Sequence, residues 1–354
     1  MSDDIMVEQV RAAAQAMAMP QGYRFDSAAV LDEAAVLPLT HLRATDGDFF
    51  AKALAERPRR PQLSKDGRLV ILAADHPARG VPGAGPDPVG MANRADYLAR
   101  IVRVLDASPV DGLMATPDVI DDIVALDALQ RRDGGKGFLG QRVLIGSMNR
   151  SGLNGARHEL WDMPTCYLSA ADLLAANLDG GKVMWRYTAQ GDANRDCLQS
   201  MVALAELLAD VAEAGLPMFL EPLVVENRFE KWLLSKDEIE WIRLIGVASA
   251  LGPSTARLWL KIPMVRPFSR IVRATTLPIL MLGGPATGIP ATVLVDFAEG
   301  MTTGPNVYGA LVGRNVLYPG SDDPAIIARA VCHIVHNQQG AEAAAAEAAR
   351  AGRL

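Results

Sequence analysis

The chain has 354 residues, of which 50% are hydrophobic and 21% are charged, and its formal net charge is −6. One domain of about 250 residues with extensions fits this length better than two half-size domains. The sequence has no basic cluster of the kind that binds nucleic acids. No apolar run approaches the roughly 20 residues that span a membrane. We therefore expect neither nucleic acids nor membranes as partners.

The cysteines and the first residues indicate a cytoplasmic protein. Cys166, Cys197 and Cys332 are far apart and form no CxxC pair. This spacing argues against a zinc module and a disulfide framework, and it suits a reducing compartment. Residues 1–5 are acidic and lack the apolar segment of a secretion signal.

Residues 1–65 are predicted to form an N-terminal helical extension. Apolar residues recur at helical spacing over 7–19, and the segments 27–31 and 49–55 predict shorter helices. A polar segment rich in arginine and proline, at 57–61, separates them from the rest of the chain. We expect this extension to pack on the main domain.

Residues 66–340 alternate short apolar runs with helical patterns, as expected for successive β–α units. Unbroken apolar runs are typical of strands that are buried on both faces. The candidate strands are 69–74, 111–116, 142–146, 182–185, 217–220, 257–260, 278–282 and 308–312. Eight such strands predict an α/β fold, a (β/α)8 TIM barrel. Residues 341–354 are predicted to be an exposed helical or frayed tail.

Nearly every predicted strand ends on a polar residue or a glycine. The active site of a TIM barrel lies at the C-terminal ends of its strands, so these positions are the candidates for chemistry. They are Asp75, His76, Ser147, Arg186, Tyr187, Glu221, Lys261, Gly283, Gly284, Gly313, Arg314 and Asn315.

Lys261 stands among the apolar residues Trp259, Leu260 and Ile262. Burial lowers the pKa of a lysine and provides a free amine for Schiff-base chemistry. A lysine whose ammonium group reaches solvent from the strand end is an equally good interpretation. Lys182 opens its predicted strand, so we expect it to be solvated at the opposite, stabilising face of the barrel.

Asp75 and Glu221 end the first and fifth predicted strands. A carboxylate near an amine stabilises its protonated form and can transfer protons. The alternatives are a buried ion pair or a helix N-cap. No helical pattern follows Asp75, which favours a functional role there, whereas both interpretations stay open for Glu221.

Arg186 and Tyr187 end the fourth predicted strand. Arg186 is a candidate for binding an anionic substrate, and Tyr187 for a general acid or for packing in the core. Because side chains alternate along a strand, one of the two should point outward.

Glycines follow the seventh and eighth predicted strands. Gly283 and Gly284 come after one, and Gly313 and Arg314 after the other. The loops at these two positions of a TIM barrel commonly bind phosphate through backbone N–H groups. Tight turns also require glycine, but the pairing of two such loops with an arginine favours a phosphate site.

The chain resembles the class I, or Schiff-base, aldolase superfamily, which includes archaeal-type fructose-bisphosphate aldolase and deoxyribose-phosphate aldolase. The similar stretches are ILAADH (71–76), LWLKI (258–262), LPILMLGGP (277–285) and VGRNV (312–316). They occur in the same order as in the archaeal-type enzymes. The lysine run is also similar to an aldolase-like domain attached to some kinases of inositol catabolism.

The resemblance implies a lyase that forms a Schiff base at Lys261, with Asp75 as its acidic neighbour and no cofactor. Gly283, Gly284, Gly313 and Arg314 would hold the phosphate of a phosphorylated keto sugar. The relatives suggest 5-dehydro-2-deoxygluconate 6-phosphate or a deoxyribose-phosphate type of substrate, and a homo-oligomer. The archaeal-type enzymes carry Trp and Tyr where this chain has Glu221 and Leu223, which leaves Glu221 or Tyr187 as the acid–base residue.

Two alternatives remain. The first is a metal-dependent lyase on the same barrel, with His76, His158 and Glu221 as ligands, although the five histidines show no metal-binding spacing. The second is a non-catalytic protein that binds a sugar phosphate.

Overall fold

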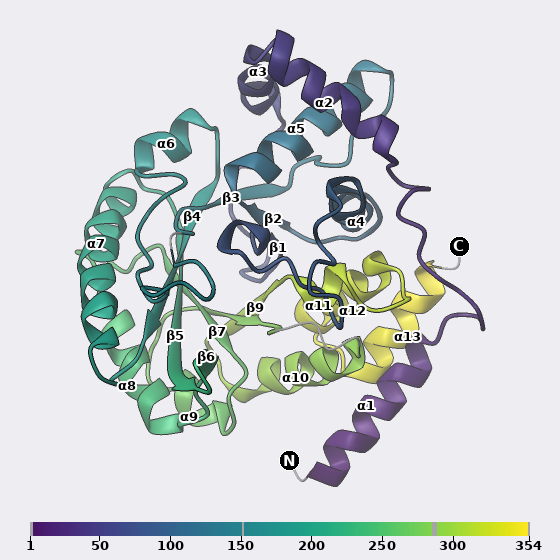
Figure 1. Cartoon of the computed structure of the whole chain (residues 1–354). Coiled ribbons are helices and arrows are strands. Elements are labelled where there is room, and N and C mark those ends of the chain that lie inside the picture. Colours follow the sequence, from purple (N-terminus) through teal and green to yellow (C-terminus); the bar gives the residue numbers. More distant parts are fainter. Residues whose placement is uncertain (1–2, 151, 285–288, 353–354) are drawn as a thin grey trace.

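The computed structural model describes residues 3–150, 152–284 and 289–352, so Pro285 of the glycine motif lies outside the described residues. Within them, eight parallel strands close into a barrel (Figure 1), which confirms the predicted (β/α)8 fold. The barrel strands, in ring order, are β1 (Leu69–Ala74), β2 (Gly112–Ala115), β3 (Val143–Ser147), β4 (Gly180–Tyr187), β5 (Met218–Arg228), β7 (Leu258–Pro263), β8 (Ile279–Leu282) and β9 (Val307–Val312). β9 pairs with β1 and closes the ring.

Helices surround the ring and bury the outer face of the strands (Figure 1). They are the α-helices α4 (Arg94–Ala107), α5 (Pro117–Arg132), α6 (Ala170–Ala175), α7 (Ala193–Glu213), α8 (Glu238–Ala248), α9 (Phe268–Val272), α10 (Pro290–Thr303), α11 (Arg314–Leu317) and α12 (Pro324–Asn337). The short 3-10 helix η1 (Pro77–Arg79) directly follows β1 and has no buried residue. None of the described helices combines the length and apolar character needed to cross a membrane.

β5 continues well past the predicted end of its strand. Its last residues pair antiparallel with β6 (Lys231–Leu234), so that β5 and β6 form a hairpin above the barrel. The turn at Phe229 and Glu230 has positive φ at both residues. The sequence stays apolar past Glu221 as far as Val225, and the strand continues with it. The predicted strand, which ended before Glu221, was therefore too short.

Alternate residues of the barrel strands point into the ring. The lower part of the interior is apolar and is filled by Leu69, Ile71, Ala73, Met114, Val143, Ile145, Phe219, Leu280 and Leu311. Continuing the same alternation toward the C-terminal ends of the strands leads to Asp75, Glu221 and Lys261. The apolar floor therefore places these charged side chains inside the barrel, above a dry core.

The N-terminal extension is helical, as predicted, and consists of α1 (Asp3–Met17), α2 (Glu33–Thr45) and α3 (Asp48–Glu56). The predicted helix at 27–31 is wrong, because this segment forms turns. The helix starts later, where the Asp32 side chain accepts a hydrogen bond from the Ala35 backbone N–H at 2.9 Å and caps α2.

The C-terminal helix α13 (Ala341–Gly352) packs against α12 and α1. The prediction of a solvent-exposed tail is wrong for this segment, because Ala344, Ala345 and Ala348 are fully buried. Alanines at helical spacing form a narrow apolar face that lets neighbouring helices approach closely. The sequence pattern alone did not indicate which helices would cover that face.

We expect Ala345→Glu to lower the free energy of unfolding by about 3 kcal/mol, because it places a carboxylate in a fully buried position. Ala343→Glu is the matched control, since Ala343 lies on the exposed face of the same helix. Urea unfolding of both variants measures the difference. Equal stability of the two variants would mean that α13 is not part of the folded core.

Candidate active site

A cavity of about 180 Å³ opens at the C-terminal ends of the barrel strands. Its polar and glycine lining consists of Asp75, His76, Arg79, Arg150, Glu221, Lys261, Gly283, Gly284, Gly313 and Arg314. Apolar side chains complete it, among them Leu234 of the β5–β6 hairpin. The cavity therefore gathers groups from strands that are far apart in the sequence, at the end of the barrel where the sequence predicted the chemistry.

Two lysines share one carboxylate beneath this cavity. Glu221 Oε1 lies 3.0 Å from Lys261 Nζ, and Glu221 Oε2 lies 2.6 Å from Lys182 Nζ. All three side chains are buried, and Lys261 is the lysine that borders the cavity. The carboxylate therefore stands between two amines, with one amine open to a bound ligand.

The position expected for Lys182 is wrong. Gly180 and Gly181 are residues of β4 and not a turn before it, and Lys182 pairs with Ser147, the last residue of β3. The Lys182 side chain is 0% exposed and points to Glu221, so it lies inside the barrel and not in solvent. Lys182, which the sequence assigned to the stabilising face, therefore belongs to the charged group of the site.

Burial and charge shift the pKa values of this group in opposite directions. Burial lowers the pKa of Lys261 below its usual 10.5, although Glu221 partly opposes it, and lowers that of Lys182 still further. Burial alone would raise the pKa of Glu221, but the two lysines and Arg150 hold it well below its usual range. Glu221 is therefore ionised at neutral pH, and the buried amines lose their protons more easily than exposed lysines do.

Asp75 is held on the other side of Lys182. Its Oδ2 atom accepts a hydrogen bond from the Ser147 hydroxyl at 2.9 Å, forms an ion pair with the Arg150 guanidinium, and lies 3.6 Å from Lys182 Nζ. Asp75 is 1% exposed. These contacts satisfy a buried carboxylate and fix its orientation toward Lys182.

The two glycine loops meet at the rim formed by β8 and β9. The Asn315 side-chain amide donates to the carbonyl oxygens of Gly283 and Gly284 and so ties the two loops together. A Cβ atom at Gly313 would lie 2.6 Å from His76 Cε1 and 3.2 Å from the Ala73 carbonyl oxygen, so any larger residue would displace the His76 ring. Arg314 borders the cavity and forms no ion pair within the described part of the chain. These features fit the predicted anion site.

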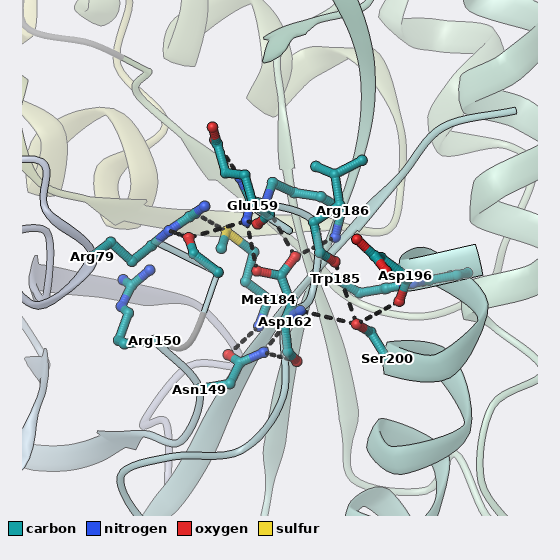
Figure 2. Close-up of polar contacts among 12 residues, drawn as sticks. Arg79, Asn149, Arg150, Glu159, Asp162, Met184, Trp185, Arg186, Asp196 and Ser200 are labelled. Atoms are coloured by element: carbon teal, nitrogen blue, oxygen red, sulfur yellow. Dashed lines mark hydrogen bonds and ion pairs between the residues drawn. The ribbon is translucent and has the colours of Figure 1, made fainter. Parts of the chain in front are cut away.

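Arg186 has a different environment from the one predicted for a substrate-binding residue. It pairs with Glu159 at 2.7 Å and with Asp162 at 2.9 Å, and it also donates to the Gly152 carbonyl oxygen (Figure 2). Its donors thus hold the loop after β3 onto β4, and Arg186 does not line the cavity.

Tyr187 also lies outside the cavity. Its ring packs on that of Trp185, with centroids 5.9 Å apart, and the Trp185 indole donates to the Cys197 carbonyl oxygen of α7. The alternation of side chains places both rings on the helix-covered face of β4. Of the adjacent pair Arg186 and Tyr187, Tyr187 is therefore the residue that points outward.

The ligand set of the metal-dependent alternative does not come together. His158 pairs with Asp196 at 3.0 Å on the outside of the barrel, whereas Glu221 is occupied by the two lysines. Among the residues that the structure describes, no three potential His, Cys, Asp or Glu ligands gather at one point.

Three side chains of the site were not predicted, namely Lys182, Arg79 and Arg150. Lys182 lies two residues before Met184, so both side chains point to the inner face of β4. The alternation of side chains along β4 is therefore the sequence signal that could have placed Lys182 inside the barrel. Arg79 ends the short helix η1 and Arg150 lies in the loop after β3, and no periodic pattern of the sequence indicates either side chain.

Comparison with known proteins agrees with this architecture. The profile of the Cgl0159-like family matches residues 67–333. The crystal structure of Cgl0159 from Corynebacterium glutamicum is 31% identical in sequence, covers 88% of this chain and 99% of its own, and superposes with a TM-score of 0.78. No curated protein matches the chain.

Two aldolase structures share the fold at lower identity. An archaeal fructose-1,6-bisphosphate aldolase, with its catalytic lysine bound to a carbinolamine intermediate, is 21% identical, with a TM-score of 0.53, over 81% of this chain and 99% of that one. The fructose-bisphosphate aldolase of Slackia heliotrinireducens is 16% identical, with a TM-score of 0.57, over 94% and 96%. The predicted resemblance to aldolases is confirmed at the level of the fold. Since the family profile spans most of the sequence, the chain belongs to the Cgl0159-like family.

Proposed function

We propose that the chain is a class I aldolase that cleaves or forms a carbon–carbon bond in a phosphorylated keto sugar through a Schiff base at Lys261. One observation carries this proposal: a buried lysine borders the cavity, with its amine 3.0 Å from an ionised carboxylate and a second buried lysine behind it. A lowered pKa leaves a larger fraction of the Lys261 amine unprotonated and therefore nucleophilic.

In the proposed reaction, the Lys261 amine attacks the substrate ketone to give a carbinolamine, which loses water and becomes an iminium ion. A base removes the proton of the hydroxyl group two carbons from the iminium carbon. The carbon–carbon bond then breaks, an aldehyde leaves, and the electron pair neutralises the iminium nitrogen to give an enamine. Protonation of the enamine and hydrolysis release the ketone product and the free amine.

Glu221 is the proposed proton-transfer residue, because one of its oxygens already contacts the Lys261 amine. The sequence left this role open between Glu221 and Tyr187, and the position of Tyr187 outside the cavity favours Glu221. Lys182 would keep Glu221 ionised, and Asp75 would stabilise the positive charge of Lys182.

The proposed phosphate site consists of the backbone of Gly283, Gly284 and Gly313 with the Arg314 guanidinium. Glycine allows the backbone N–H groups to approach a phosphate closely. This site would fix the phosphorylated end of the substrate and so hold its carbonyl group against Lys261.

Borohydride trapping tests the proposal. The protein is incubated with dihydroxyacetone phosphate and reduced with borohydride, and its peptides are mapped by mass spectrometry. We expect a stable adduct on Lys261. An adduct confined to another lysine, or none with any keto-sugar phosphate, would refute the assignment.

Trapping should depend on pH in a defined direction. Only the unprotonated amine attacks, and burial lowers the pKa of Lys261 below 10.5. With cyanoborohydride as reductant, the rate should therefore rise with pH and reach half its maximum clearly below pH 10.5. Nα-acetyl-lysine serves as the exposed reference amine, and a half-maximum that coincides with that of this reference would show that Lys261 is not shifted.

A further inference from the structure

Two cationic groups line opposite sides of the cavity. The ring order places β4 and β9 four strands apart in both directions, the greatest separation in a ring of eight. Arg314 follows β9, whereas the Arg79 guanidinium contacts Met184 of β4. Lys261 is on β7, two strands from each of them. A ligand whose ketone reaches Lys261 thus has a cation on either side.

Arg79 is held in place but keeps free donors. It comes from the end of η1, its Nε donates to the Gly152 carbonyl oxygen at 3.0 Å, and its Nη1 lies 3.0 Å from Met184 Sδ (Figure 2). Its Nη2 has no hydrogen-bond partner among the described residues, and the side chain lines the cavity. Two contacts therefore orient a guanidinium group whose remaining donors are available to a ligand.

The surroundings of Arg79 suit a single negative charge. Burial lowers its pKa to about 10, so it is still protonated at neutral pH. Asp162, Glu221 and Glu159 are close enough to raise that pKa again, and these carboxylates would repel a phosphate dianion more strongly than a carboxylate. The glycine backbone that suits phosphate lies on the β8–β9 side of the cavity. Arg150, which also lines the cavity, is already paired with Asp75, and Arg186 of β4 does not line it.

We propose that Arg79 is the residue that recognises a second anionic group of the substrate, the carboxylate of a keto acid that is phosphorylated at its other end. A keto acid of this kind is among the substrates that the resemblance implies, and the inference rests on the proposed aldolase function. A guanidinium group and a carboxylate have matching planar geometries and form two parallel hydrogen bonds. Arg79 thereby selects an acid over the corresponding neutral sugar.

The test compares two substrates that differ only at this end. The first is 5-dehydro-2-deoxygluconate 6-phosphate, and the second is its analogue with the carboxylate reduced to CH2OH. We expect kcat/KM of the protein to favour the acid by at least about 100-fold. Arg79→Gln should reduce this preference to less than about fivefold, and Arg79→Lys should restore part of it. Arg132→Gln, an exposed arginine at the end of α5, should keep the full preference.

Trapping with dihydroxyacetone phosphate, which has no carboxylate, separates this inference from the proposed function. An adduct on Lys261 in Arg79→Gln would show that the variant is folded and its amine competent. If trapping succeeds but the protein does not prefer the acid, or Arg79→Gln retains the preference, the role of Arg79 is refuted while the aldolase remains. If no adduct forms in the unaltered protein, the proposed function fails and this inference fails with it.

Discussion

Replacing Lys261 by methionine should abolish the adduct with dihydroxyacetone phosphate and lower kcat/KM by at least about 1,000-fold. Methionine has a similar length and fills the same buried space, but it has no amine to attack the ketone. Glu221 keeps its other partner, Lys182, so the variant should still fold. Circular dichroism and the turnover of a keto-sugar phosphate measure the two properties separately.

Lys182→Met and Lys136→Met are the controls for this experiment. Lys182→Met should slow turnover but leave the adduct on residue 261, because Lys182 does not border the cavity. Lys136→Met, at an exposed surface lysine, should change neither property. An adduct that persists in Lys261→Met and disappears in Lys182→Met would show that the Schiff base forms at Lys182 of β4 and would refute the assignment to Lys261.

Glu221→Gln should lower the free energy of unfolding at pH 7 by about 3 kcal/mol. The substitution keeps the shape of the side chain but removes the negative charge that both buried lysines share. Removing one partner of a buried ion pair leaves an uncompensated buried charge and typically costs 3–5 kcal/mol. Urea unfolding measures the loss.

The loss should shrink as the pH rises. Glu221 raises the pKa of Lys182 and Lys261, so these values fall further below 10.5 in Glu221→Gln. Between the folded pKa and 10.5, the unfolded chain binds more protons than the folded one, and stability therefore rises with pH in that window. Above the folded pKa values of both amines, which lie below 10.5, the amines are neutral in the folded state of both proteins, and the deficit should be smallest there.

Glu240→Gln is the matched control for Glu221→Gln. Glu240 forms an ion pair with Arg243 at 2.6 Å on the surface of α8, where such pairs contribute less than about 1 kcal/mol. A pH-independent deficit in Glu221→Gln, or one as small as that of Glu240→Gln, would contradict the shared-carboxylate arrangement.

The sequence predicted the barrel because its strands are buried on both faces and read as continuous apolar runs. It failed where the structure depends on tertiary contacts. The alanines of α13 are buried only because α1 and α12 cover them. The predicted fifth strand ended at Leu220, so the β5–β6 hairpin, which lies beyond the barrel, was not predicted.

The candidate site was partly predictable for the same reason. Asp75, Glu221 and Lys261 end strands, and parallel strands bring their C-terminal ends together, so their proximity follows from the fold. Lys182 was missed because two glycines at the start of β4 resemble a turn. Arg186 was assigned to substrate because its partners, Glu159 and Asp162, lie in a loop whose path no pattern predicts.

The hairpin also bears on how the protein behaves at high concentration. Within the closed ring each barrel strand has a neighbour on both sides, so among the described strands the β5–β6 hairpin carries the free strand edges, with β6 as its outer strand. Exposed edges recruit strands from other molecules, and short or lysine-bearing edges resist this. β6 has four residues and begins with the exposed Lys231. Intermolecular strand pairing, and the fibrous aggregates that follow from it, should therefore be rare for the folded chain.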